Sequence, residues 1–244
     1  MGKAKKSERL DKYLSEALGL SRSQSRELIA RKKVLVDGIA AQRADQPLTG
    51  GEVVTLEGRR LEREKYIYLM LNKPQGVVSA SRDKRDVTVT DLVQKEFPRR
   101  QLFPAGRLDK TSTGFVLITD DGVFAHQILA PRRHVSKTYQ VLLDCPCTPE
   151  MCRGFEEGVT LADGQKLAPA LLRPDPRDPC RAEVVLRQGV YHQIKRMFGV
   201  YGAGVNALHR LAIGSVQLDE TLAPGQWRPL SGEELETLRR ESGG

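Results

Sequence analysis

The first part of the chain contains two short stretches in which apolar residues recur at helical spacing. We expect the first helix to end at Gly19, and its apolar positions are Leu10, Leu14, Ala17 and Leu18. A second helix is predicted after Ser21, because Gln24 follows three residues later, which is the spacing of a capping box. Its inner face consists of Ser25, Leu28 and Ile29.

Short strand patterns follow these helices. "VLVDGIA" predicts two strands joined by a tight Asp37-Gly38 turn, and "GGEVVTLEG" predicts another strand after a glycine turn. The next segment, "EGRRLEREK", is charged and has almost no apolar residues, which is typical of a linker. We therefore predict a small domain at 8–57, a linker at 58–65 and a larger domain at 66–241.

The larger region has more strand patterns than helix patterns. "YIYLMLNKPQG" contains an apolar run short enough for a buried strand, closed by a turn at Lys73-Pro74 and Gly76. "GFVLITDDG" predicts a strand followed by a turn at Asp121-Gly122, and "KTYQVLL" and "RAEVVLRQG" predict two more strands. Helical spacing returns in "HQIKRMFGVYG", and a last helix is expected from Ser231, with Glu234 completing a capping box.

These patterns together predict an α+β fold. We expect a small N-terminal αα-β-hairpin domain, followed by a domain with a mixed, largely antiparallel sheet flanked by helices. No glycine-rich loop follows a strand and opens a helix, so dinucleotide and triphosphate folds have no support.

Composition and charge narrow the classes of function. No apolar run approaches the roughly 18 residues that span a bilayer, and the N-terminus does not resemble a secretory signal, so we expect a cytoplasmic protein without membrane contact. The net charge of +8 favours a polyanionic partner, of which nucleic acid is the first candidate. Five basic residues surround Glu27 on the second predicted helix and just after it: Arg22, Arg26, Arg31, Lys32 and Lys33. Such a face is either a solvated surface or a contact for RNA.

The sequence shows no arrangement typical of a metal or cofactor site. Its four cysteines include no Cys-x-x-Cys pair, and no suitably spaced histidine lies near them, so we expect neither a metal nor a cofactor. Metal-dependent or histidine-based RNA cleavage, and methyl transfer, would each require features that are not evident. A rearrangement that uses a single carboxylate remains compatible with the sequence.

Asp109 is the candidate carboxylate. It lies between Arg107 and Lys110 in "PAGRLDKTSTGF", followed by a threonine-serine-glycine bend. This acid is either a turn residue paired with its neighbours or the reacting group of an enzyme. Local chemistry alone favours the first interpretation.

Two resemblances to known families favour the second interpretation instead. "ERLDKYLSEALGLSRSQSRELIARKKVLVDG" resembles the S-four-type RNA-binding domain, in which the basic helix face grips RNA phosphates. Most of residues 66 to 230 resemble the pseudouridine synthases, most closely the RsuA-type branch that acts on small-subunit ribosomal RNA. "GRLDKTSTGF" matches that family's first motif, "KTYQV" its second, and "YHQIKRMF" with "ALHRLAIG" its third.

The second resemblance implies a role for each matching residue. Asp109 would be the catalytic carboxylate, acting either as nucleophile or as base, and Lys195 would be its basic partner. Arg107 would enter the space vacated by a flipped uridine, and Tyr139 would stack on the flipped uracil. Leu208 would pack beneath the site, and Arg210 would share its face if that stretch is a strand. The remaining histidines, His126, His192 and His209, have no paired acid in the sequence and are expected to be structural or to contact RNA, while Arg132, Arg133 and His134 add positive charge.

The resemblance also leads to a functional expectation and its alternatives. The chain has Gln188-Gly189-Val190 where the third motif usually has a glutamate and a basic residue, which removes one expected phosphate contact, and Phe115 replaces a leucine. "YHQ" at 191–193 favours the small-subunit branch. We expect a monomeric enzyme that converts a uridine of 16S ribosomal RNA to pseudouridine within an assembling small subunit. The alternatives are a 23S synthase and a non-catalytic, RNA-binding assembly factor.

Overall fold

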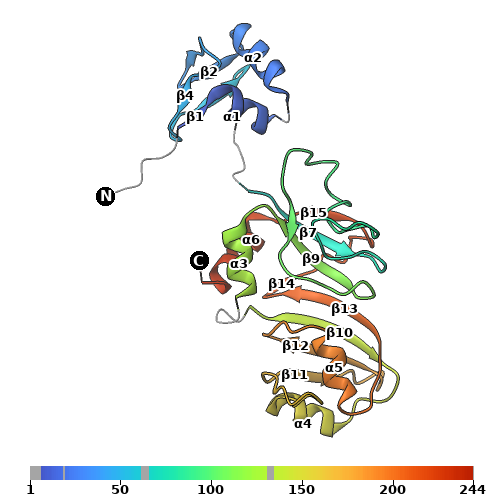
Figure 1. Ribbon diagram of the computed structural model, residues 1–244. Coiled ribbons are helices and arrows are strands. Elements are labelled where there is room, and N and C mark those ends of the chain that lie inside the picture. Colours follow the sequence, from blue (N-terminus) through green and yellow to red (C-terminus); the bar gives the residue numbers. More distant parts are fainter. Residues whose placement is uncertain (1–6, 19, 62–65, 131–134, 244) are drawn as a thin grey trace. The chain divides into compact units, whose positions relative to one another are not determined.

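The computed structural model describes residues 7–18, 20–61, 66–130 and 135–243 (Figure 1). The chain forms two compact units, residues 1–65 and 66–244, which are described separately below. Several positions named above lie outside the described residues: Gly19, residues 62–65 of the predicted linker, Arg132, Arg133 and His134.

The N-terminal unit packs two helices against a small sheet. Its helices are α1 (Leu10–Ala17) and α2 (Arg22–Ala30), and its four-stranded sheet has the order β3 (Ile39–Ala40), β2 (Val34–Val36), β5 (Val54–Leu56), β6 (Arg59–Arg60). A separate two-stranded pair joins β1 (Glu8–Arg9) to β4 (Pro47–Leu48). The capping box at Ser21 is confirmed, and Asp37 and Gly38 both have positive φ in the predicted hairpin turn. Leu10, Leu14 and Ile29 are buried together with Val34 and Val54 from the sheet.

The predicted linker is wrong in its first part. Glu57 and Gly58 have φ values of 50° and 82°, which form a tight turn, and β6 returns antiparallel to β5. Arg59 and Arg60 are both exposed, so this edge strand has no apolar face to reveal it in the sequence. Position 61 also joins the unit, because the Leu61 amide donates to the Val54 carbonyl oxygen at 2.8 Å.

The second unit is built on a mixed sheet, which contains nine strands within the described residues (Figure 1). The main order is β11 (Leu171–Pro174), β12 (Arg181–Leu186), β10 (Lys137–Leu143), β13 (Val205–Ile213), β9 (Thr113–Thr119), β7 (Tyr68–Lys73), β15 (Trp227–Pro229). β14 (Val216–Gln217) pairs with β13, and β8 (Phe103–Pro104) pairs with β9. Among these pairings β9 and β13 run parallel and the others run antiparallel. The predicted α+β class, with a largely antiparallel sheet flanked by helices, is confirmed.

The central strands β7 and β9 are buried on both faces, which explains their uninterrupted apolar runs. On one face, Met70 and Phe115 pack against α3 (Gly122–Leu129) and α6 (Gly232–Glu241). On the other face, Leu71 and Val116 pack against the segment 77–108. The other half of the sheet, around β10 and β12, packs against α4 (Pro149–Glu157) and α5 (Gln193–Gly199) (Figure 1).

The helices include one correction. Asp121 and Gly122 were predicted as a turn, but Asp121 is the N-cap of α3, and its carboxylate accepts the amides of Val123 and Phe124. An Asp before a glycine serves either purpose, and here apolar residues at helical spacing continue the helix. The predicted α5 and α6 are confirmed, with the capping box at Ser231. No helix in the described ranges has the length and apolar character needed to cross a bilayer.

Candidate active site

Asp109 lies in the loop between β8 and β9, next to an anchored leucine. Leu108 is buried in the core that Leu71 and Val116 form on one face of β7 and β9. Its amide donates to the Ser79 hydroxyl at 3.0 Å, and that hydroxyl donates to the Leu108 carbonyl oxygen at 3.0 Å. The side chain of Asp109 remains 28% exposed. The loop therefore fixes the backbone beside a carboxylate that solvent can still reach.

Lys73 holds the same loop from beneath. It is fully buried at the end of β7, and its ammonium donates to the carbonyl oxygens of Ser112 at 2.6 Å and Pro74 at 3.0 Å. The Gly76 amide also donates to the Lys110 carbonyl oxygen at 2.8 Å. Burial lowers the pKa of Lys73 to about 8; the charge of Asp109 opposes this shift and that of Arg210 adds to it. Sequence reasoning placed Lys73 only in a turn and missed this role.

The parallel pairing of β9 with β13 brings two distant motifs together. Thr113 is opposite His209 and Gly114 is opposite Arg210. Gly114 has a φ of 101°, and a Cβ there would lie 2.4 Å from the Arg210 carbonyl oxygen, so only glycine fits. Thr113 Oγ1 lies 2.8 Å from His209 Nδ1, and burial lowers the pKa of His209. Gly114, in the first motif, thus allows β9 to lie close to β13, the strand that carries part of the third motif.

The beginning of α5 supplies the groups that face Asp109. Lys195 Nζ lies 4.0 Å from Asp109 Oδ2 and donates to Thr111 Oγ1 at 3.0 Å. His192 Nε2 lies 3.3 Å from Asp109 Oδ1. The sequence shows no acid paired with His192, and the structure supplies one from a distant loop. Its position three residues before Lys195, at the start of a predicted helix, was the available signal.

Arg210 and Tyr139 are neighbours on adjacent strands. They are opposite one another in the β10–β13 pairing, and the Arg210 guanidinium carbon lies 5.9 Å from the Tyr139 ring centroid. Arg210 is 3% exposed and its Nε donates to the Phe115 carbonyl oxygen at 2.6 Å. Its Nη2 is buried without a hydrogen-bond partner among the described residues. A buried donor of this kind is available to a ligand oxygen.

Leu208 and Arg107 occupy contrasting positions. Leu208 and Arg210 both lie in strand β13, so the stretch is a strand, as their predicted common face required. Leu208 is buried in a core that includes Ile194, Met197 and Phe198. It thereby supports α5 from below. Arg107 is exposed, two residues before Asp109. Of the predicted site residues, the structure brings Lys195 to within 4.0 Å of Asp109, and it adds His192 at 3.3 Å.

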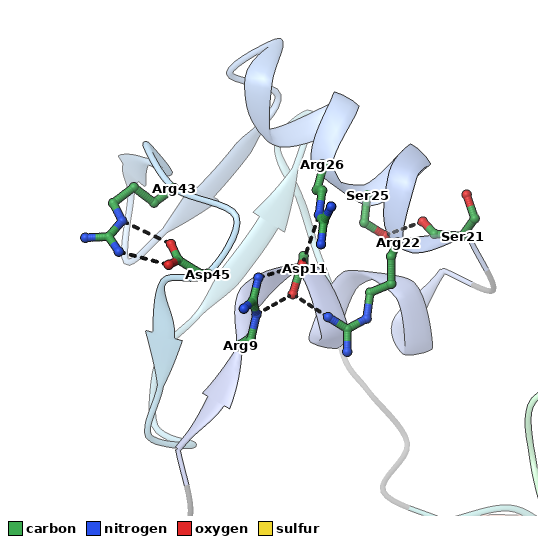
Figure 2. A network of polar contacts seen from close by, with 8 residues as sticks. All are labelled: Arg9, Asp11, Ser21, Arg22, Ser25, Arg26, Arg43 and Asp45. Atoms are coloured by element: carbon green, nitrogen blue, oxygen red, sulfur yellow. Dashed lines mark hydrogen bonds and ion pairs between the residues drawn. The ribbon is translucent and has the colours of Figure 1, made fainter.

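The five basic residues that were predicted to bind RNA differ in their contacts. Arg22 and Arg26 both contact the buried carboxylate of Asp11 (Figure 2). Arg31 pairs with Glu27 and Lys33 pairs with Glu57, each at 2.5 Å, and Lys32 is exposed at the end of α2. Within the described ranges of both units, no three His, Cys, Asp or Glu side chains are grouped so as to hold a metal ion.

Comparisons with known proteins identify the families to which the two units are similar. Residues 67–199 match the family described as RNA pseudouridylate synthase, and residues 8–54 match the S4 domain. The chain is 40% identical to an uncharacterized RNA pseudouridine synthase of Bacillus subtilis, covering 94% of this chain and 98% of that protein. It is 39% identical to ribosomal small subunit pseudouridine synthase A of Escherichia coli K12, covering 94% and 99%.

A solved structure is similar over nearly the whole chain. A crystal structure of a pseudouridylate synthase has a TM-score of 0.67 and 36% identity, and the match covers 94% of this chain and 99% of that one. The loop of Asp109 and the start of α5 both lie within the matched family region. The chain therefore belongs to the RNA pseudouridylate synthase family and carries an S4 domain in its N-terminal unit.

Proposed function

We propose that the protein isomerises a uridine of 16S ribosomal RNA to pseudouridine, with Asp109 as the catalytic carboxylate. The observation that carries this proposal is the placement of Asp109 within 4.0 Å of Lys195, in a loop anchored by Lys73 and Ser79. The choice of small-subunit RNA is supported by relatives such as those of Escherichia coli and Yersinia pestis, whose names specify that subunit.

The reaction detaches uracil from its ribose, turns the base and rejoins it through a ring carbon, so no electrons enter or leave. Asp109 attacks the substrate or removes a proton from it, and both roles use the ionised carboxylate. The ammonium of Lys195 stabilises that negative charge across 4.0 Å. The anchored loop keeps the carboxylate in position while the base turns.

The surrounding residues suit a flipped nucleotide. Tyr139 supplies an aromatic ring for stacking on the uracil, a contact typically worth about 1 to 3 kcal/mol. The unpartnered Nη2 of Arg210 is a donor for a uracil or backbone oxygen beside that ring. Arg107 is exposed near Asp109 and is placed to fill the space left in the RNA stack, offsetting part of the few kcal/mol that flipping costs.

The substrate form is the remaining element of the proposal. We assign an assembling small subunit as substrate, a monomer as the active species and the cytoplasm as its location, where ribosomal RNA is assembled. The S4 domain supports RNA binding by the N-terminal unit. A 23S synthase would differ in target alone, and a non-catalytic assembly factor would leave Asp109 without a chemical role.

Two experiments test the function. In a deletion strain, carbodiimide-primed reverse transcription maps every ribosomal pseudouridine, and a site lost from 16S RNA and restored by the wild-type gene is the expected result. Asp109→Asn should bind RNA without restoring the site. Asp86→Asn is the matched control, because Asp86 pairs with the neighbouring Lys110 at 2.7 Å and should restore it fully. Restoration of the site by Asp109→Asn would refute the catalytic assignment. If the deletion strain instead lost a pseudouridine from 23S RNA, the substrate would be 23S RNA and not 16S RNA.

A further inference from the structure

Two aromatic rings are stacked at the start of α5, beside the proposed catalytic carboxylate. The centroids of the Tyr191 and His192 rings are 3.8 Å apart, and the planes of the two rings differ by 17°. The same imidazole places its Nε2 atom 3.3 Å from Asp109 Oδ1. One histidine therefore connects the ring of Tyr191 to the carboxylate.

The ring of Tyr191 is exposed, although the turn that carries it is anchored. Tyr191 is 75% exposed, whereas Gln193, two residues later, is 4% exposed. The Val190 amide donates to Gln193 Oε1 at 3.0 Å, and the Gln193 amide donates to the Val190 carbonyl oxygen at 3.1 Å. These two hydrogen bonds close a turn around Tyr191 and His192. The tyrosine is thus held on a fixed turn, with most of its surface in solvent.

The packing of the protein itself does not explain this position. The core beneath α5 contains Ile194, Met197 and Phe198, and Tyr191 lies outside it. In the described part of the chain, His192 provides the one ring against which Tyr191 stacks. Single exposed apolar side chains are common on protein surfaces, but here a fixed aromatic ring lies at the edge of an active site. Its open face is available for stacking with a partner.

We propose that Tyr191 is a stacking platform for an unpaired nucleobase of the RNA, close to the uridine that is flipped toward Asp109. The proposal rests on the proposed function, because that function supplies the RNA. Every base has a π-face, so a tyrosine ring can bind a base without specific hydrogen bonds. A base on the open face of Tyr191 extends the stack of tyrosine and histidine, whose inner member contacts Asp109.

The groups around the platform favour a nucleotide over a protein surface. Lys195 is about one third exposed, and Arg107 is exposed in the loop of Asp109. Cations beside an aromatic ring suit a nucleotide, which combines a flat base with a phosphate. Val200 is also exposed and apolar, but it lies at the opposite end of α5, so the two side chains do not form one apolar patch.

The platform places a requirement on the substrate. A base inside a regular RNA helix is covered on both faces by its neighbours. Stacking on Tyr191 therefore requires a nucleotide near the target uridine that is unpaired or displaced from its helix. A purine has a larger face than a pyrimidine, so we expect the platform to bind a purine more tightly.

The experiment removes the ring and the base separately. Overlapping fragments of 16S ribosomal RNA are titrated with the full-length protein, and the fragment that binds most tightly is prepared with an abasic nucleotide at one position at a time. Tyr191→Ala should weaken binding of the intact fragment by about fivefold to a hundredfold, the range of base–aromatic stacking. One abasic position should weaken binding of the wild type to a similar extent. Tyr191→Ala should then cause no further loss with that abasic RNA.

Three further variants complete the design. Tyr191→Phe keeps the aromatic face and should bind like the wild type. Tyr191→Leu keeps an apolar side chain without that face, and it serves as the second variant if urea unfolding shows that Tyr191→Ala does not fold. Val200→Ala is the matched control, because it also removes an exposed apolar side chain beside α5, and it should leave RNA affinity unchanged.

The outcomes separate the platform from the function itself. Equal affinities of the Tyr191→Ala and Val200→Ala proteins, or a loss in Tyr191→Ala that persists with every abasic RNA, would overturn the platform. Pseudouridine formation by the wild type is measured on the same fragment. If pseudouridine forms and binding does not depend on Tyr191, the platform alone is refuted. If Tyr191 and one base depend on each other but no pseudouridine forms, the proposed function is refuted and the platform stands.

Discussion

His192 Nε2 lies 3.3 Å from one carboxylate oxygen of Asp109, and Lys195 Nζ lies 4.0 Å from the other. Both nitrogen groups come from the first turn of α5 and the residue that precedes it. The orientation of a single short helix therefore determines the surroundings of the proposed catalytic group. Leu208 and the core beneath α5 determine that orientation in turn.

Removing the cation of Lys195 should slow catalysis with little loss of stability. Two unit charges 4 Å apart interact by about 1 kcal/mol in water and about 4 kcal/mol at a dielectric constant near 20. Both side chains are about one third exposed, so the lower half of this range applies. Lys195→Met should reduce the single-turnover rate by roughly tenfold to thirtyfold, and Lys195→Arg should recover most of it. Equal rates for the Met and Arg variants would contradict an electrostatic role.

Two substitutions of His192 separate its contact with Asp109 from the demands of its backbone conformation. Its φ is 49°, a left-handed conformation that asparagine tolerates and β-branched residues do not. His192→Asn should leave the urea midpoint nearly unchanged while lowering the single-turnover rate several-fold, because the contact with Asp109 is lost. His192→Val should lose stability as well, by about 1 to 2 kcal/mol. A His192→Asn enzyme with the wild-type rate would reduce His192 to a structural role.

The rate should fall as pH rises above about 8, when buried Lys73 loses its charge. Its pKa of about 8 lies below the ordinary 10.5, chiefly because burial disfavours the ammonium. Between pH 8 and pH 10.5, Lys73 is protonated in the unfolded chain but largely deprotonated in the folded protein. Because the unfolded state binds more protons, the contribution of Lys73 to the free energy of unfolding increases with pH in this range. We therefore expect the single-turnover rate to fall above pH 8 while the free energy of unfolding, measured with urea, rises.

Lys137 provides the control for that pH profile. Burial also lowers its pKa to about 8, but its ammonium donates to the Val135 carbonyl oxygen and not to the Asp109 loop. Lys137→Met should keep the decline in rate above pH 8, whereas Lys73→Met should show a low rate with no decline there. If the decline in rate above pH 8 disappears in Lys137→Met and persists in Lys73→Met, the assignment of the decline to Lys73 is wrong. If Lys73→Met does not fold, the profiles of wild type and Lys137→Met still decide the matter.

Gly114→Ala should be strongly destabilising. The added Cβ would lie 2.4 Å from the Arg210 carbonyl oxygen at a φ of 101°, so β9 and β13 must separate. We expect a loss of at least about 3 kcal/mol in urea unfolding, combining steric overlap with backbone strain. Gly225→Ala is the control, because its φ is also positive at 90° but no atom lies within 4 Å, and it should cost about 1 kcal/mol. Equal losses would show that strain alone acts at Gly114.

Elements with local signals were predictable from the sequence. The capping boxes at Ser21 and Ser231 satisfy amides within one turn, and Asp37-Gly38 adopts the positive φ values that its turn requires. Strand β6 was missed because Arg59 and Arg60 are exposed at an edge and leave no apolar trace. Helix α4 was missed although Thr148 caps it and Pro149 follows, which is a local signal that could have been used.

The site was predictable only where a residue carried a family motif. Asp109 and Lys195 were identified by resemblance, and no local property of either residue places them 4.0 Å apart. Lys73 escaped notice because lysine is seldom fully buried, and its partners are carbonyl oxygens that carry no sequence signature. The contacts of Asp11 with three arginines were not predicted, because these side chains meet only after α1 and α2 pack together.

The parallel pairing of β9 with β13 also bears on the synthesis of the enzyme. Thr113 and His209 meet across 96 residues of chain, so this contact closes late and at an entropic cost. Asp109 leaves the ribosome long before Lys195, His192 and Arg210 have been made. An unfinished chain consequently holds the carboxylate without the two side chains of α5 and its N-cap that lie against it. The order of synthesis therefore makes the complete surroundings of Asp109 a property of the finished chain alone.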